Sequence, residues 1–416
     1  MKILFINKYD ITGGAGVTAF RLHKALEHRF NTDDLFLVGI KKSNLDIVLS
    51  TRNPGFQNFA ERGLNFLFNQ IGLQYKFHPF SSKIILEVTK KFSPDIISLH
   101  NAHGGYFQTS LLIELSKIAP IVWTLHDMWA FTANAAHTFG DVSWEKMQSG
   151  KNERKLFPQI GLNTGNWLLK EKKRIYSNSN IAIVTPSKWL FDLARRSPVF
   201  EEKKIIHIPN GVDLNIFSPK EKTALRNELG IPLDAKTLIF GAEKILTGNY
   251  KGGADLINIL EILNSKLDQK VHLIIVGHSD LKKLHDFKNF EIHETGYIYK
   301  EKDMAKYLSA ADIFIYPTKA DNLPNALIEA SACGVPSVTY DIGGCKEIIV
   351  DGFNGYVIPY GQVNLFVDKV KVLLENEELK KSFSNNAVKV ASEKFSVDDM
   401  ADKYYGLFEK LSALFS

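Results

Sequence analysis

The sequence has little cysteine and no long hydrophobic run. Its 416 residues include only two cysteines, Cys333 and Cys345, which excludes a disulfide framework and a cysteine metal cluster and suits a reducing compartment. We expect both to be small core residues. Because no run reaches about 18 apolar residues, the sequence predicts no membrane-spanning helix. The apolar stretch in MKILFINKYD is too short for a signal peptide, and we expect a buried strand over 3–7.

A strong charge imbalance is also missing. Lys and Arg number 51 against 46 Asp and Glu, a net charge of +5. This balance is too weak to indicate nucleic-acid binding, and it fits anionic ligands or an anionic membrane surface. A hydrophobic content of 45% is typical of soluble globular proteins. The length exceeds what one core usually supports, so we expect two or three domains.

Short apolar, β-branched runs recur along the chain in two series, and segments with helical spacing separate most of them. Continuous rather than alternating hydrophobicity indicates parallel strands that are covered on both faces. The first series is ILFIN, DLFLVGI, DIISLHN, IVWTLHD, IAIVTPS and KIIHIPN; the second is TLIFGAE, VHLIIVG, FEIHETGYI, ADIFIYP and PSVTYDI. A charged, turn-rich stretch over 211–236 separates the two series and indicates a linker.

The pattern predicts an α/β protein with two Rossmann-like, doubly wound parallel-sheet domains. We place the N-terminal domain at 1–212, the C-terminal domain at 213–395, and a last helix at 396–416 that can pack on either domain. Glycine and polar clusters follow the C-terminal ends of most strands, which is the edge where doubly wound sheets bind ligands. If the two edges face each other, they form one interdomain cleft.

A glycine turn follows the first expected strand. Residues 14–19 match the pattern GxGxxG/A. Gly13, just before it, and Gly14 would let backbone N–H groups approach a diphosphate at a helix N-terminus. A tight turn without a ligand is the alternative. NAD binding would also need an acidic residue after the second strand, where the sequence has Lys41 and Lys42, so NAD is disfavoured.

His126 and Asp127 end the strand IVWTLHD, with Trp129 close behind. A histidine at this position can orient a hydroxyl or stabilise developing charge; a hydrogen-bonded structural histidine is the alternative. Metal binding is disfavoured because no second His or Cys lies nearby at ligand spacing. Lys244 and Lys251, beside a second glycine turn, suit phosphate binding, although a lone lysine often serves solubility.

Two carboxylates occupy an otherwise apolar strand–turn–helix. No Lys or Arg occurs between Lys319 and Lys346 to pair with Asp321 or Glu329. The alternatives are a helix N-cap for the first acid and a solvent-facing position for the second. Because Asn325 and Glu329 are four residues apart, they share one helix face. We therefore expect a polar stripe that binds the hydroxyls of a sugar or a ribose.

The chain resembles the retaining glycosyltransferases of family four, whose GT-B fold has two facing Rossmann domains. The segments that carry the resemblance span roughly residues 1 to 365 in the expected order. The nearest subgroup comprises bacterial surface-polysaccharide enzymes with a DNLPN motif. The segments are ITGGAG, WTLHDMWAFT, VTPSKWL, IPNGVDLNIFSP, YKGG, ADIFIYPT, DNLPNALIEASACGVPSV and GGCKEIIVDGFNGYVIP.

The resemblance implies roles for individual residues. Glu329 would hold the nucleotide ribose, Asp321 the donor hexose, Lys251 the diphosphate, and His126 the donor sugar near the reacting centre. The expected catalytic residues are His126, Lys251 and Asp321. The expected donor-binding residues are Gly13, Gly14, Lys244, Lys251, Gly296, Tyr297, Asp321, Asn322, Leu323, Pro324, Asn325 and Glu329. The expected acceptor-side residues are Asn101, His103, Asp127 and Trp129.

The sequence departs from the family pattern at three places. The arginine that usually precedes the diphosphate lysine is absent, and Lys244 is the candidate replacement. The first paired acid is Asp321 rather than Glu, which shortens its reach. The subgroup often has a cysteine-rich stretch after LHDMW, but residues 133–153 contain no cysteine. We therefore expect any metal site or rigid acceptor loop built on those cysteines to be lost.

The expected function is retaining transfer of a hexose from a nucleotide diphosphate sugar to a hydroxyl of a glycan or lipid-linked glycan. We expect no cofactor, no metal, no nucleic-acid partner and a cytoplasmic protein. Segments 58–77 and 168–174 could contact the inner membrane face. The alternatives are a non-catalytic sugar-nucleotide-binding protein, a sugar-nucleotide epimerase and a nicotinamide oxidoreductase.

Overall fold

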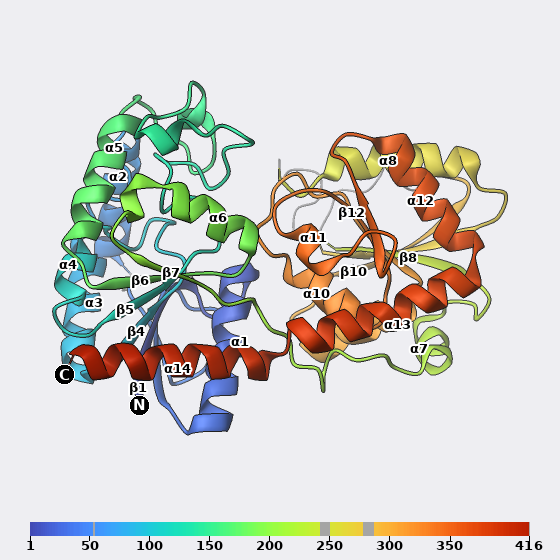
Figure 1. Cartoon of the computed structure of the whole chain (residues 1–416), viewed down its shortest axis with the longest axis horizontal. Coiled ribbons are helices and arrows are strands. Elements are labelled where there is room, and N and C mark those ends of the chain that lie inside the picture. Colours follow the sequence, from blue (N-terminus) through green and yellow to red (C-terminus); the bar gives the residue numbers. More distant parts are fainter. Residues whose placement is uncertain (53–54, 242–249, 278–286, 416) are drawn as a thin grey trace. The chain divides into compact units, whose positions relative to one another are not determined.

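The computed structural model describes residues 1–52, 55–241, 250–277 and 287–415. The chain divides into two compact units (Figure 1). Unit 1 comprises Met1–Pro209 and the segment from Asp398 onward, and unit 2 comprises Asn210–Val397. The units therefore divide at residues 209/210, where the sequence analysis placed a boundary at 212/213. In the described part of the chain no helix combines the length and hydrophobicity that crossing a membrane requires.

Unit 1 is built on a seven-stranded sheet of order β3-β2-β1-β4-β5-β6-β7, in which every pairing is parallel. Six strands match the six expected apolar runs; the three-residue edge strand β3 is too short to give a sequence signal. The order reverses between β1 and β4, which creates a topological switch point. The strands are β1 (Lys2–Tyr9), β2 (Asp33–Ile40), β3 (Val48–Ser50), β4 (Ile96–Leu99), β5 (Ile121–Thr124), β6 (Ile181–Thr185) and β7 (Lys204–His207).

The residues of β1 alternate between two packed layers. Leu4 and Ile6 join the core beneath α3, α4 and α5, whereas Phe5 contacts His23 of α1 edge to face. The described helices of unit 1 are α1 (Gly13–Phe30), α2 (Phe56–Gln70), α3 (Pro79–Phe92), α4 (Leu111–Leu115), α5 (Gly165–Ser177), α6 (Lys188–Arg196) and α14 (Val397–Phe415), with short 3₁₀ turns at Ser143–Lys146, Glu153–Lys155 and Pro198–Phe200.

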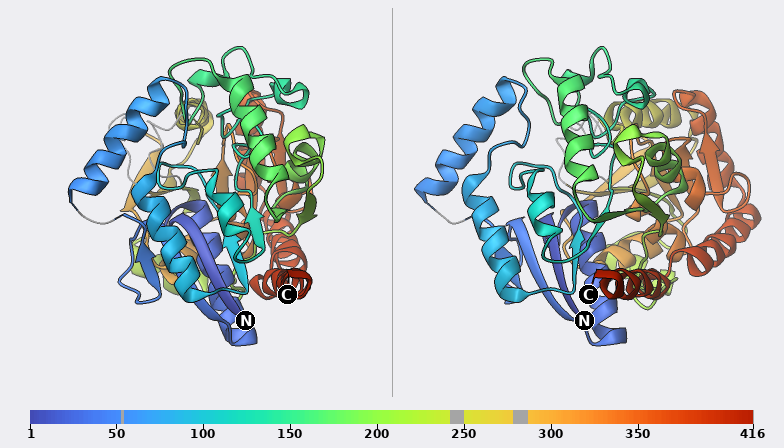
Figure 2. Two further views of the ribbon diagram at one scale, coloured as in Figure 1. Left: turned by 90° about the vertical axis from the view of Figure 1, so that its left-hand side faces the viewer. Right: turned by 60° about the vertical axis from the view of Figure 1, so that its left-hand side comes forward.

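The C-terminal helix α14 packs on unit 1 beside α1 (Figures 1 and 2). The guanidinium of Arg29 on α1 donates to both carboxylate oxygens of Asp402, at 2.9 and 2.8 Å. Beneath them the hydroxyls of Tyr404 and Thr124 lie 2.8 Å apart. Of the two packing arrangements that the sequence left open for this helix, the structure shows the one against the N-terminal domain.

Unit 2 has a six-stranded, all-parallel sheet of order β10-β9-β8-β11-β12-β13. Its switch point lies between β8 and β11. Five strands match expected runs, and β13, with two partly exposed residues, was not expected. The strands are β8 (Lys236–Gly241), β9 (Val271–Val276), β10 (Phe290–Gly296), β11 (Ile313–Tyr316), β12 (Ser337–Tyr340) and β13 (Gly355–Ile358).

Helices cover both faces of this sheet, as continuous hydrophobicity in its strands predicted. Leu238 and Phe240 of β8 pack with α8 and α12, whereas Ile239 points to the opposite core with α9 and α10. Cys333 and Cys345 are free and buried, which confirms them as core residues. The described helices are α7 (Lys222–Leu229), α8 (Gly253–Lys266), α9 (Glu301–Ala310), α10 (Asn325–Ala332), α11 (Cys345–Ile348), α12 (Val363–Glu375) and α13 (Glu377–Lys394).

Candidate active site

In unit 2, two of the candidate residues meet at the switch point between β8 and β11. Lys251 precedes α8, and Asp321 lies in the loop after β11. Nζ of Lys251 lies 2.7 Å from Oδ2 of Asp321. The hydroxyl of Tyr316, the last residue of β11, donates to the same oxygen at 2.7 Å, and the backbone N–H of Asn322 donates to Oδ1 at 2.9 Å. The Asp321 carboxylate therefore binds Lys251 and also stabilises the turn in which Asp321 lies.

This pairing corrects the expectation that Asp321 has no basic partner. Lys251, which lies 70 positions earlier in the sequence, supplies it. The expectation was wrong because it considered only the neighbouring residues of the same strand–turn–helix. In a parallel sheet, the residue that follows one strand lies next to the residue that follows the adjacent strand, however far apart they are in sequence.

The segment 322–329 forms a largely buried turn and helix start. Pro324 is the N-cap residue of α10, so Asp321 is not its cap. Glu329, on the second turn of α10, is only 8% exposed, which excludes a solvent-facing position. Asn322 and Leu323 are also buried. The amide of Asn210 donates to Oδ1 of Asn325 at 3.1 Å and to the Leu323 carbonyl at 3.4 Å.

Two glycines permit the close approach of neighbouring backbones at this loop. Gly252 has φ +73°, and a Cβ there would lie 1.7 Å from the carbonyl oxygen of Pro317. Gly343 has φ +56°, and a Cβ there would lie 1.8 Å from the carbonyl oxygen of Asp321. Because both positions need a left-handed backbone and have no room for a side chain, only glycine fits them.

The remaining donor candidates of unit 2 lie elsewhere along the same sheet edge. Gly296 ends β10 with φ +66°, and its carbonyl accepts the Gly277 N–H at 2.9 Å. Tyr297 follows, with its ring centroid 4.6 Å from that of Tyr299. Lys244 lies outside the described residues. Two strands, β9 and β8, separate β10 from β11, so the Gly296–Tyr297 pair is a second cluster on this edge.

In unit 1, the glycine turn opens α1 at the switch point. Gly13 has φ +71°, and Cβ atoms added at Gly13 or Gly14 would meet nothing within 4 Å. Gly16 packs closely, because its Cβ would lie 3.3 Å from the carbonyl oxygens of Tyr9 and Asp10. The turn therefore has one glycine that packs against the strand end and two beside open space, where an anion can approach the helix N-terminus.

His126 forms a pair with a second histidine that the sequence analysis did not single out. Its Nε2 lies 3.0 Å from Nδ1 of His100, and Nε2 of His100 lies 3.2 Å from the hydroxyl of Ser98. Burial lowers the pKa of His126 to about 4 despite the opposing attraction of Asp127. Burial likewise lowers the pKa of His100. The pair therefore presents neutral imidazoles at neutral pH.

The acceptor-side candidates form one connected network. Nε2 of His103 lies 2.7 Å from Oδ2 of Asp127, and the backbone N–H of Trp129 donates to Oδ1 of Asp127 at 2.9 Å. Oδ1 of Asn101 accepts the backbone N–H of His103 at 3.1 Å. Burial opposes ionisation of Asp127, but the neighbouring His103 outweighs it and lowers the pKa of this carboxyl. Ser98 lies on β4, and His100, Asn101 and His103 follow this strand. His126 and Asp127 follow β5, so adjacent strands bring these side chains together.

Two buried charges order the long loop after β5, although it lacks cysteines. The Glu153 carboxylate accepts N–H groups of Ala133, Asn134 and Gly150 at 2.7, 3.2 and 2.9 Å. The Lys172 ammonium donates to three loop carbonyls at 2.5, 2.9 and 3.2 Å. Loss of the cysteines has therefore not left this loop without cross-links. The sequence signal was weak, because each residue looks like an ordinary surface charge.

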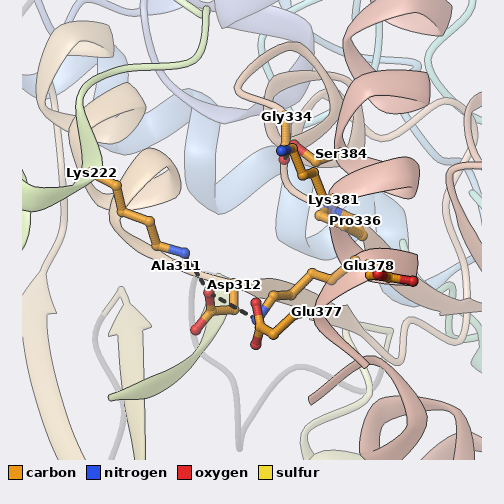
Figure 3. Close-up of a pocket in the computed structure, with 10 residues that line it drawn as sticks. Lys222, Ala311, Asp312, Gly334, Pro336, Glu377, Glu378, Lys381 and Ser384 are labelled. Carbon is orange, nitrogen blue, oxygen red and sulfur yellow. Dashed lines mark hydrogen bonds and ion pairs between the residues drawn. The ribbon is translucent and has the colours of Figure 1, made fainter. Parts of the chain in front are cut away.

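A pocket of about 390 Å³ opens at the opposite edge of the unit 2 sheet (Figure 3). It lies beside Asp312, which precedes β11, and Pro336, which precedes β12. Its central carboxylate already has basic partners, since Asp312 contacts Lys222 and lies 3.4 Å from Lys380. Doubly wound sheets bind ligands at the C-terminal ends of their strands. The Lys251–Asp321 edge is thus the better candidate site.

Models of two glycosyltransferase families match different parts of the chain. The model of Glycosyltransferase Family 4 matches residues 12–216, and that of Glycosyl transferases group 1 matches residues 221–390. Together the two models span nearly the whole chain. The chain belongs to the GT4-type glycosyltransferases. Its two Rossmann-like units are those of the GT-B fold, which confirms the predicted fold class.

Two curated relatives each match about half of the chain. The N-acetyl-alpha-D-glucosaminyl L-malate synthase of Bacillus anthracis is 25% identical over 50% of this chain and 54% of its own. The N,N'-diacetylbacillosaminyl-diphospho-undecaprenol alpha-1,3-N-acetylgalactosaminyltransferase of Campylobacter jejuni is 25% identical over 51% and 56%. The chain thus spans about half the length of these curated relatives. HepE of Anabaena, solved in complex with UDP-glucose, superposes with a TM-score of 0.67 at 16% identity, covering 99% of this chain and 100% of its own.

Proposed function

We propose that the protein transfers a hexose from a nucleotide diphosphate sugar to a hydroxyl of a glycan or lipid-linked glycan, with retention of the anomeric configuration. The Lys251–Asp321 pair at the switch point of unit 2 carries the proposal. An ammonium beside a glycine turn suits a diphosphate, and the pair lies in the part of the chain that matches the group 1 model. The complex of HepE with UDP-glucose supports a donor of this class.

The donor would occupy the C-terminal strand edge of unit 2. Lys251 has three N–H donors. Among the residues that the structure describes, Asp321 accepts one of them, and the others would bind diphosphate oxygens. Asp321 and the segment Asn322–Asn325 would bind the hexose hydroxyls, and Glu329 the ribose. Gly296 and Tyr297, on the same edge, would contact the nucleotide, and Lys244 is the proposed replacement for the missing arginine.

The residues of unit 1 would complete the reaction. Gly13 and Gly14 would donate backbone N–H groups to the diphosphate, where open space surrounds the turn. The neutral imidazole of His126 would contact the donor sugar near its anomeric carbon, without adding positive charge beside a cationic transition state. Asn101, His103, Asp127 and Trp129 would orient the acceptor, since their hydrogen bonds fix one another.

In the proposed reaction, the bond between the anomeric carbon and the diphosphate oxygen breaks as the acceptor hydroxyl attacks from the same face. The acceptor proton passes to the departing phosphate oxygen. Cations and backbone N–H groups stabilise the leaving group, so we propose that transfer needs no divalent metal. Lys251 and the glycine N–H groups fill this role.

A thermal-shift screen over nucleotide diphosphate sugars, followed by turnover on the hits, tests the proposal. We expect one donor to raise the melting temperature and to be consumed only with a hydroxyl acceptor, and NMR of the product to show the donor's anomeric configuration. Donor binding without hydrolysis or transfer would instead indicate a binding protein. Conversion of the donor without acceptor to an isomeric sugar nucleotide would indicate an epimerase, and an inverted product would contradict retention.

We further propose that α2 rests on a membrane surface that presents the lipid-linked acceptor. Phe56, Phe59, Phe66 and Leu67 lie on one side of this helix and are 60–82% exposed. Such an amphipathic helix can lie in a membrane interface, and the Campylobacter relative is named for an undecaprenol-linked substrate. Figure 2 shows α2 at the periphery of unit 1.

Liposome co-sedimentation tests this contact. We expect Phe59→Asp to reduce binding to vesicles that contain anionic lipid, because it places a charge on the face that would enter the interface. Leu414→Asp is the matched control, since Leu414 is 76% exposed at the far end of α14. Equal loss in both variants, or no binding by the unmodified protein, would contradict the proposal.

A further inference from the structure

Two histidines and a glutamate share one face of the unit 2 sheet at its β10 edge. His272 lies on β9, while Glu291 and His293 lie on β10. The strand register pairs Glu291 directly with His272. Residues two apart on a strand point to the same side, so Glu291 and His293 both lie on the face of His272. Because none of the three falls in a recognisable ligand motif, the sequence gives no signal for this group.

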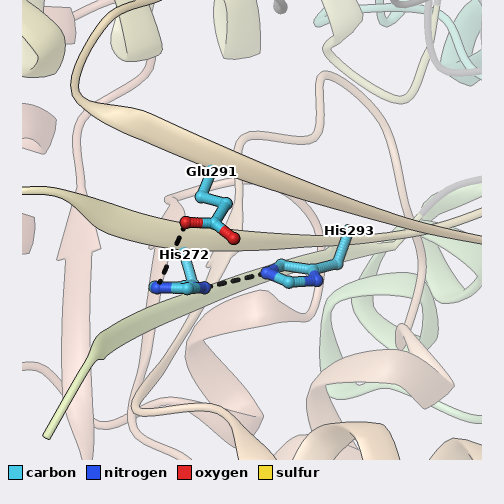
Figure 4. A group of neighbouring side chains, drawn as sticks. All are labelled: His272, Glu291 and His293. Atoms are coloured by element: carbon cyan, nitrogen blue, oxygen red, sulfur yellow. Dashed lines mark hydrogen bonds and ion pairs between the residues drawn. The ribbon is translucent and has the colours of Figure 1, made fainter. Parts of the chain in front are cut away.

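The three side chains converge (Figure 4). Nδ1 of His272 lies 2.8 Å from Nε2 of His293, and Nε2 of His272 lies 3.8 Å from Oε2 of Glu291. One ligand atom of each residue can be chosen so that all three lie within 4.8 Å of one another. Two imidazole nitrogens on a tetrahedral zinc ion are about 3.3 Å apart. The two contacts use different nitrogens of His272, so binding an ion requires side-chain rotations that turn one of them toward both partners.

The surroundings favour ligation over protonation. Burial, as the largest cause, lowers the pKa of His272, which keeps its imidazole neutral, as a metal ligand must be. The nearest cation of α7, Arg226, is held by Asp312 with Nη2 2.9 Å from Oδ2, so its charge is largely compensated. His272 is buried, His293 half-buried and Glu291 exposed, which leaves one side open for water ligands.

We propose that His272, Glu291 and His293 bind a divalent transition-metal ion, with Zn²⁺ as the reference ion and water in the remaining position. Two imidazoles and a carboxylate are the ligand types that zinc takes in proteins. The ion fastens the edge strand β10 to β9. It lies before the strand ends that carry the donor candidates, so it stabilises unit 2 and takes no part in the transfer. The inference does not depend on the proposed function.

Zinc binding to the full-length protein, after removal of metals with a chelator, tests the proposal near neutral pH. We expect calorimetry and elemental analysis to give one zinc per chain with micromolar or tighter affinity, and zinc to raise the melting temperature. His293→Asn and Glu291→Gln should each weaken binding by at least about tenfold. Both side chains lie at the sheet edge, so these variants should fold.

His28→Asn is the matched control, because His28 is an exposed histidine of unit 1, and it should bind zinc as the unmodified protein does. The proposal is overturned if the unmodified protein binds no zinc at micromolar concentration, or if the two ligand variants bind it unchanged. The three residues would then be a hydrogen-bonded histidine pair beside a surface acid. Because zinc binding is measured without a sugar nucleotide, its outcome is separate from that of the transfer assay.

Discussion

Replacement of Lys251 by methionine separates a catalytic role from a structural one. The side chain of Lys251 is 40% exposed and that of Asp321 is 17% exposed. Ion pairs with this exposure contribute up to about 1 kcal/mol. Asp321 keeps two hydrogen bonds in the variant, from Tyr316 and the Asn322 N–H. For a unit of this size, 1 kcal/mol corresponds to a fall in melting temperature of about 2–4 °C.

The effect on transfer should be much larger. Removal of one preorganised group that stabilises a leaving group typically lowers kcat by about 10²–10³-fold. All five tryptophans lie between residues 123 and 189, so their fluorescence reports on unit 1. The stability of unit 2 should therefore be followed by calorimetry or circular dichroism, and kcat by release of the nucleoside diphosphate at saturating acceptor.

Lys266→Met is the matched control. The Lys266 side chain is 38% exposed and lies 2.8 Å from Asp368, but it ends α8, whereas Lys251 precedes the start of that helix. We expect the control to lose little stability and no activity. The assignment is refuted if Lys251→Met transfers the sugar at the normal rate, or if both variants lose activity equally.

Three further variants test the structure around the candidate sites. Gly252→Ala should destabilise unit 2 by several kcal/mol, because its Cβ would lie 1.7 Å from a carbonyl oxygen. The control Gly230→Ala, also at positive φ but beside open space, should cost only about 1 kcal/mol. Similar free energies of unfolding for the two variants in urea would show that the clash at Gly252 is relieved. The pKa of His126 lies near 4 in the folded protein, below the ordinary 6.5. Between these values the unfolded chain binds a proton that the folded chain does not, so the free energy of unfolding should fall as the pH drops from 6.5 towards 4. His126→Gln should flatten this dependence in tryptophan fluorescence, and an unchanged slope would contradict the assignment. Asp312→Asn leaves buried cations without their counter-charge, so it should lower the free energy of unfolding by about 3–5 kcal/mol. The control Asp368→Asn, at an exposed pair, should lower it by under about 1 kcal/mol. Equal falls in melting temperature by calorimetry would contradict a buried network around Asp312.

The fold was largely predictable because its signals are local. Continuous apolar runs predicted eleven strands, which appear as β1, β2, β4 to β7 and β8 to β12. Among the strands of the described residues, the runs missed β3 and β13, which contain one and two buried residues, too few to give a pattern. The limits of α10 are local as well, because Pro324 is its N-cap residue and Gly334, at φ +71°, lies just beyond its end; backbone restrictions of proline and glycine act within one or two residues.

The partners of the site side chains depend on the tertiary structure. The sequence by itself determined that Asp321 follows a buried strand and that Lys251 borders a glycine turn. Only the strand order, which puts β8 beside β11, brought the two within 2.7 Å and corrected the idea of an unpaired acid. The same holds for His100 with His126 and for the zinc candidates, which register aligns across strands. Strand pairing depends on contacts between distant segments, so the partners of a charge cannot be found from its neighbours in the sequence.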